Sequence, residues 1–131
     1  MSLIFPQVDL ITPHVISAVG ASGGATTYQY YIEEAKFHYS STSPFSLDVI
    51  RDGDGGEQVF ALNYRNDEPV LVTLNETVTA RWFRIEPTDA STYVMLTMEL
   101  YGKPLGKRGD ASMFLCRLVY GDTVVDIVIT F

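Results

Sequence analysis

Hydrophobic and polar residues alternate with a period of two along most of this chain. No window of about 11 or more residues carries the hydrophobic stripe of an amphipathic helix. Clusters of Gly, Pro, Asn and Asp separate the alternating segments, as turns between strands require. We therefore predict an all-β fold, an antiparallel β-sandwich of jelly-roll type. The predicted strands are residues 7–12, 14–19, 26–32, 35–40, 45–51, 57–64, 69–75, 77–86, 92–101, 112–120 and 123–131.

One segment, residues 31–36, also has a helical alternative, because Glu33, Glu34 and Ala35 favour a helical turn. The apolar alternation runs up to Ile32 and resumes out of phase from Ala35. A strand with a β-bulge accounts for this shift, so we predict strand over helix.

The chain ends in a predicted hairpin that is extra to the jelly roll. Two apolar runs flank Gly121-Asp122, a pair suited to a two-residue turn. Several strands are apolar on both faces, which is more apolar surface than one core needs. We therefore predict that one uninterrupted apolar row binds other protein subunits. This row consists of Val125, Ile127, Ile129 and Phe131.

The first 24 residues are predicted to form an extended N-terminal arm and a glycine hinge, with the sandwich domain spanning 25–131. Pro6 and Pro13 interrupt this apolar segment, so we expect that it is not a central strand. Residues 20–24 are rich in glycine and form the hinge. An arm of this kind can reach another chain, through Leu3, Ile4 and Phe5. The alternative is an edge strand folded back on its own sheet.

A longer motif adds a family resemblance. The sequence ARWFRIEPT at 80–88 is followed by Glu-Leu-Tyr-Gly at 99–102, and Lys-Phe-His-Tyr-Ser stands at 36–40. This arrangement resembles the discoidin-type (coagulation-factor C-type) domains of the galactose-binding-like jelly rolls, over about residues 32–103. The resemblance implies a jelly-roll fold. In such domains a Cys directly follows the Leu-Tyr-Gly, whereas this chain has Lys103.

The same resemblance implies a structural role for two arginines. Arg81 and Arg84 lie on the strand that carries Trp82, and we place them on opposite faces. In the resembled family such arginines bridge to carboxylates, for which Glu86 or Glu99 is the expected partner. The alternative is a cationic ligand contact on a face of the sheet.

Composition limits the functional classes. The chain of 131 residues is 47% hydrophobic and 19% charged, with a net charge of −7. Nucleic-acid binders concentrate Lys and Arg, so this charge argues against a nucleic-acid partner. The single cysteine makes no internal disulfide, which favours a reducing cytoplasm. We recognise no signal peptide at the start and no apolar run of membrane-spanning length, and we expect no membrane association.

Two loops contain candidate sites. Asp52, Asp54 and Glu57 stand in a glycine-rich segment and are weak candidates for a calcium site, with a plain turn as the favoured interpretation. Arg108-Gly109-Asp110 resembles an integrin-binding tripeptide in an exposed loop, although Gly-Asp is also a common turn pair.

The remaining reactive residues do not indicate catalysis. His14 and His38 lack a second ligand at metal-binding spacing. Cys116 lies among apolar residues and is predicted to be a buried, unreactive thiol. Trp82 and Ile85 are predicted to be largely buried. We therefore predict a non-enzymatic protein without a cofactor.

Two functions fit these expectations. The first is a structural or accessory virion protein, a capsid decoration or tail component of a bacteriophage, that forms a homo-oligomer or part of a larger particle. Such a protein is made in the cytoplasm and localises to the virion. The alternative is a carbohydrate-binding or adhesion module for cell-surface glycans. Its aromatic platforms would come from Tyr28, Tyr30 and Tyr31, or from the loop between Tyr39 and Phe45.

Overall fold

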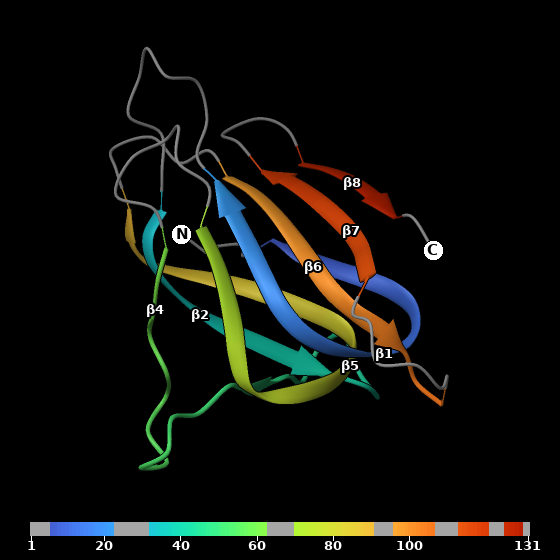
Figure 1. Ribbon diagram of the computed structural model, residues 1–131, viewed down its shortest axis with the longest axis horizontal. Helices are drawn as coiled ribbons and strands as arrows, with labels where there is room; N and C mark the ends of the chain where they lie inside the picture. Colours follow the sequence, from blue (N-terminus) through green and yellow to red (C-terminus); the bar gives the residue numbers. More distant parts are fainter. Residues whose placement is uncertain are drawn as a thin grey trace.

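The computed structural model describes residues 6–22, 32–62, 70–90, 96–106, 113–120 and 125–129. These residues form eight strands and no helix (Figure 1). The described part of the chain therefore contains no helix that is long and apolar enough to cross a membrane. The strands are β1 (Gln7–Ser22), β2 (Ile32–Ser40), β3 (Asp48–Val49), β4 (Phe60–Ala61), β5 (Val70–Ala90), β6 (Leu96–Pro104), β7 (Met113–Tyr120) and β8 (Val125–Ile129).

All the strands belong to one antiparallel sheet. Its order is β3-β2-β5-β1-β6-β7-β8, and β4 also pairs with β2. Two long strands, β1 and β5, take part in both halves of the sheet. The first half combines β2, β3 and β4 with residues 82–90 of β5 and residues 7–9 of β1. The second half combines residues 70–80 of β5 with residues 14–22 of β1 and with β6, β7 and β8. The fold is therefore all-β and sandwich-like, as predicted.

The sheet changes direction at a corner, which we define as residues 10–13 of β1 and the facing residues 80–82 of β5. Asp9 pairs with Trp82, and the next pair in the register is His14 with Ala80. Four residues of β1, 10–13, therefore lie opposite the single residue Arg81 of β5. Figure 1 shows the sharp turn of β5 near the lower edge of the view. Strands pass from one layer of a sandwich to the other at such bulges.

This corner explains why one prediction is wrong. We expected Pro13 to exclude a central strand, yet β1 lies between β5 and β6. Pro13 falls within the unpaired residues of the corner, where a missing N–H breaks no ladder hydrogen bond. Its carbonyl oxygen accepts a hydrogen bond from the backbone N–H of Leu105, at 3.2 Å. The predicted arm therefore overlaps a strand of the sheet. Residues 1–5 and Gly23-Gly24 lie outside the described residues.

The strand boundaries differ from the predicted ones in a consistent way. Two pairs of predicted strands merge, 7–12 with 14–19 into β1, and 69–75 with 77–86 into β5. Two others are shorter than predicted: the described residues of 45–51 and 57–62 contain the two-residue strands β3 and β4. The predicted bulge in β2 is confirmed by register shifts on both sides of Glu34. The pairing of β7 with β8 confirms the C-terminal hairpin, whose turn lies outside the described residues.

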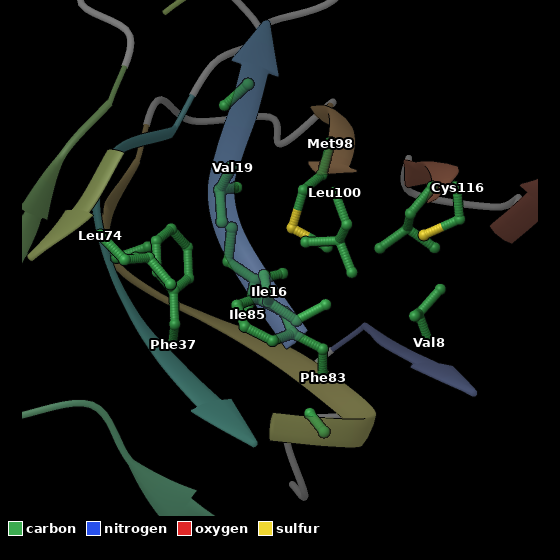
Figure 2. Packing of buried hydrophobic residues seen from close by; sticks show 14 of the residues in the cluster. Val8, Ile16, Val19, Phe37, Leu74, Phe83, Ile85, Met98, Leu100 and Cys116 are labelled. Carbon is green, nitrogen blue, oxygen red and sulfur yellow. The ribbon is translucent and has the colours of Figure 1, made fainter. Parts of the chain in front are cut away.

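The core fills the space between the two halves of the sheet. Figure 2 shows side chains of β2 and β5 meeting those of β1, β6 and β7. Phe37 packs at its centre, with its ring 4.6 Å from that of Phe60 and 5.5 Å from that of Phe83. Cys116 is buried, as predicted, and burial raises the pKa of its thiol to about 12. The thiol therefore stays protonated and unreactive at neutral pH.

The prediction that Ile85 is largely buried is confirmed, and Trp82 is partly buried but less so than its neighbour Phe83. Phe83 and Ile85 are fully buried, whereas Trp82 is only half-buried. Side chains alternate along a strand, so Trp82 and Arg84 take the outer face once Phe83 points into the core. Upstream of the corner, Ala80 is the buried residue. The turn at the corner thus shifts the alternation by one residue.

Candidate functional site

Most of the predicted site residues lie outside the described residues. They are Leu3, Ile4, Phe5, Tyr28, Tyr30, Tyr31, Arg108, Gly109, Asp110 and Phe131. For Val125, Ile127 and Ile129 the structure describes the backbone pairing alone. Ile127 is opposite the buried residue Leu118, and Ile129 is opposite the buried residue Cys116.

The loop with Asp52, Asp54 and Glu57 forms a tight turn. The carboxylate of Asp52 accepts hydrogen bonds from the backbone N–H groups of Asp54 and Gly56, at 2.9 and 3.0 Å. Glu57 instead pairs with Lys36 at 3.2 Å. Across the described residues, no group of three or more His, Cys, Asp or Glu side chains is placed to hold a metal ion. The geometry matches the turn interpretation of this loop.

The corner carries a different cluster, built on Arg81. Its guanidinium donates two hydrogen bonds to the carboxylate of Asp9, at 2.8 and 3.1 Å. The same guanidinium lies over the ring of Trp82, with its central carbon 4.4 Å from the ring centroid. The hydrogen bond from Arg81 lowers the pKa of Asp9 below its usual value, and the bond to Asp9 raises the pKa of Arg81. The Arg–Trp pair is therefore held in one orientation.

Our expectation for the partners of the two arginines is wrong in detail. Arg81 binds Asp9, while Arg84 donates to the side-chain oxygen of Gln7 at 2.8 Å. Both acceptors lie on β1, and both alternate with the buried residues Val8 and Leu10. The two arginines thus reach the same outer face. Of the expected acceptors, Glu86 pairs with His38 at 2.8 Å and Glu99 with Arg117 at 3.6 Å.

Next to this cluster, the loop after β2 presents Phe45. The carbonyl oxygen of Pro44 accepts hydrogen bonds from the side chains of Gln7 and Arg84, at 3.2 and 3.3 Å. Ser40 accepts from the backbone N–H groups of the next turn, and Ser43 accepts from that of Phe45. Despite this anchoring, the Phe45 side chain is 92% exposed. The loop therefore holds a large apolar ring in solvent.

Ile11 completes the cluster. It has a φ of 71°, a left-handed conformation that a β-branched residue rarely adopts. Its backbone N–H donates to Asp9 at 2.8 Å, and its side chain is 57% exposed. Strained backbone of this kind is often found at functional sites. We call the group of Asp9, Ile11, Phe45, Arg81 and Trp82 the corner patch.

Sequence reasoning missed most of the corner patch. Asp9 and Arg81 are 72 residues apart, and only the strand register brings them together. Phe45 gave a signal, since it lies in the loop after Tyr39 that we considered as an aromatic platform. No pattern in the sequence marks Ile11 as strained.

A groove forms a second candidate site, between the segment from β3 to β4 and the first part of β5. Figure 1 shows these segments, in green and yellow-green, beside each other. The groove has a volume of about 690 Å³. It is lined by Tyr39, Asp48, Val49, Ile50, Arg51, Asp52, Gly53, Gln58, Asn75, Glu76, Thr77, Val78 and Thr79. Its polar side chains come from two segments that are distant in the sequence.

In comparisons with known proteins, no family model matches the chain, and no curated protein matches it significantly.

Proposed function

We propose that this protein is a non-enzymatic structural component that acts through contacts with other protein subunits. The observation that carries the proposal is the exposure of Phe45 on an anchored loop. A rigid aromatic side chain loses little entropy on binding, so it can contribute strongly to an interface. Binding hot spots are enriched in Trp and Arg, and the corner patch contains both.

Two further exposed apolar side chains support the same proposal. Among the described residues, Leu105 and Met113 are exposed at the end of the sheet near the corner, while Val59 and Leu71 are exposed elsewhere. Leu105 is hydrogen-bonded to Pro13, and Met113 pairs with Gly102 next to β1. Apolar side chains gathered at one end of a sheet are typical of an interaction surface.

We further propose that the assembly is a virion, with the protein as a capsid decoration or tail component of a bacteriophage. Features of the chain itself support this proposal. The chain is small, has a net charge of −7, and contains one cysteine that is buried as a free thiol. The resemblance to discoidin-type domains is part of the same proposal and concerns the fold.

The experiment compares two single variants by sedimentation velocity over a range of concentrations. Phe45→Ser removes the exposed ring from the corner patch, and Val59→Ser is the control, an exposed apolar residue elsewhere. We expect the wild type and Val59→Ser to associate alike, and Phe45→Ser to shift toward monomer. Equal association of all three proteins would contradict a role for the corner patch in self-association. Electron microscopy of the associated protein tests for rings or other closed particles.

A carbohydrate-binding module is the second candidate, and one observation favours it. The groove beside β5 has a volume typical of small-molecule sites, which is about 300–1,000 Å³. Its lining combines carboxylate, amide and hydroxyl groups with a tyrosine. A strict monomer in solution would favour this module, whereas a stable ring or trimer would favour the assembly component.

A further inference from the structure

The groove beside β5 has polar side chains that the fold does not use. Hydrogen bonds among the described residues account for one carboxylate oxygen of Asp52 and for one guanidinium nitrogen of Arg51. Five other lining side chains make no hydrogen bond or ion pair with any other residue that the structure describes: Asp48, Gln58, Asn75, Glu76 and Thr77. Asp48 and Gln58 lie on the wall formed by the segment from β3 to β4, and the other three lie on the wall formed by β5. A ligand between the walls can therefore contact polar side chains on both sides.

Backbone pairing anchors both walls of the groove to the sheet, while Asn75, Glu76 and Thr77 themselves lie at a register shift between β1 and β5. On one side, Arg51 and Glu57 form a β-bridge, and Glu57 is also tied to Lys36 of β2. On the other side, residues 75–79 belong to β5, and Val78 and Thr79 pair with β1. A site that is formed in advance loses less free energy to ordering when it binds.

The charge of the groove limits the class of ligand. Asp48, Asp52 and Glu76 contribute three carboxylates, and Arg51 contributes one guanidinium, so the lining has a formal charge of −3 + 1 = −2. That guanidinium already donates to the carbonyl oxygen of Gly55, at 3.1 Å. A sulfate, phosphate or carboxylate group on a ligand would meet net repulsion.

The chemistry of the lining favours neighbouring hydroxyl groups. Carboxylates accept hydrogen bonds, while amides and hydroxyls both donate and accept. Asp48 and Glu76 supply side chains that only accept hydrogen bonds. Gln58, Asn75 and Thr77 supply side chains that both donate and accept. A sugar hydroxyl also donates and accepts, so it can use both kinds at once.

Apolar contacts are available in the same groove. Tyr39 is half-buried and packs against the core, and it lines the groove together with Val49 and Val78. These side chains offer contact to the C–H groups of a sugar ring. Ligand sites commonly combine such apolar walls with a few placed polar groups.

We propose that the groove binds a neutral oligosaccharide, with Asp48, Asn75 and Glu76 as the residues that recognise its hydroxyl groups. This inference rests on the second candidate function, carbohydrate binding, and does not involve the corner patch.

The test applies the purified protein to an array of neutral, sialylated and sulfated glycans, and adds an oligolysine peptide as a cationic probe. Dissociation constants for the strongest ligand are then measured for three proteins. They are the wild type, the double variant Asn75→Ala with Glu76→Ala, and the control Asp54→Asn. Asp54 is exposed on the same loop as Asp52 but does not line the groove.

We expect neutral glycans to bind, the double variant to lose at least about tenfold in affinity, and the control to bind as the wild type does. Since the substituted positions are exposed, the variants should fold, which circular dichroism checks. Neutral glycan binding that the double variant leaves unchanged would overturn the groove as the site and leave the carbohydrate function standing. Binding to anionic glycans alone, or to oligolysine alone, would overturn the ligand class. No binding to any glycan would overturn both the inference and the function on which it rests.

Discussion

Trp82 and Phe83 are neighbours of similar apolar character, yet they take opposite places in the molecule. Phe83 contacts Phe37 in the core, whereas Trp82 lies under Arg81 on the outer face. We therefore expect burial, rather than the size of the ring, to determine how much each side chain contributes to the free energy of unfolding.

We predict that Phe83→Ala lowers the free energy of unfolding by about 3–5 kcal/mol, the usual cost of truncating a core aromatic. Trp82→Ala should cost clearly less, because its ring already contacts solvent. Urea denaturation followed by far-UV circular dichroism measures both. An equal shift of the two midpoints would show that Trp82 carries as much of the core as Phe83.

The ion pair of Asp9 and Arg81 predicts a pH dependence. The pKa of Asp9 is lowered in the folded protein from an ordinary value of 3.8. The pair therefore stabilises the fold fully above the unfolded pKa, and its contribution is lost as the pH falls through the lower folded pKa. Since the pair is partly exposed, solvent screening keeps its contribution small.

The measurement is the difference in melting temperature between the wild type and Asp9→Asn at pH 7 and at pH 3. Asparagine keeps an acceptor for the N–H of Ile11 but removes the charge. We expect the wild type to be more stable at pH 7 and the difference to shrink at pH 3. A difference that is the same at both values would assign the effect to packing or hydrogen bonding instead of charge.

At the scale of the strands, β6 and β1 approach each other closely at Gly102. Gly102 pairs with Ile16 of β1 and with Met113 of β7. A Cβ atom on Gly102 would overlap the backbone carbonyl of Val15, which has little room to move within a paired strand. The position belongs to the Glu-Leu-Tyr-Gly motif at residues 99–102, so the motif has a packing reason for its glycine.

We predict that Gly102→Ala destabilises the protein by roughly 3 kcal/mol, at the upper end for overpacking. Gly53→Ala is the matched control, because a Cβ atom there meets nothing within 4 Å. Chemical denaturation of both variants makes the comparison. If Gly102→Ala kept the stability of the control, β6 would have to lie farther from β1 than the structure places it.

The strands could be predicted because the alternation of apolar and polar residues is a local property of the sequence. The corner could not be predicted in this way. A β-bulge depends on which residues of two distant strands face each other, as Asp9 and His14 face Trp82 and Ala80. The sequence alone placed both Arg81 and Trp82 by simple alternation, and the bend altered that alternation. The groove was hidden for the same reason, since Asp48 and Glu76 lie on segments distant in the sequence that only the fold brings to one groove.

For the whole molecule, the sharing of β1 and β5 between both halves predicts cooperative unfolding. Neither half keeps a complete sheet if the other unfolds, so a single two-state transition is expected. The only tryptophan, Trp82, sits where the halves join and serves as a fluorescent probe of the corner. Its fluorescence and the far-UV circular dichroism signal should change at the same urea concentration. Two separate midpoints would mean that the halves are independent units.

The position of β1 in the sheet also has a consequence for the order of events during synthesis. Its partners are β5 and β6, which reach as far as Pro104. The ribosome therefore releases β1 long before either partner strand is synthesised. Until then, the apolar residues of β1 have no strand to pair with and stay exposed. Folding dominated by such distant pairings is slow, in the range of milliseconds to seconds. An apolar strand without its partners is prone to aggregation, so the yield of soluble protein should depend on the rate of synthesis.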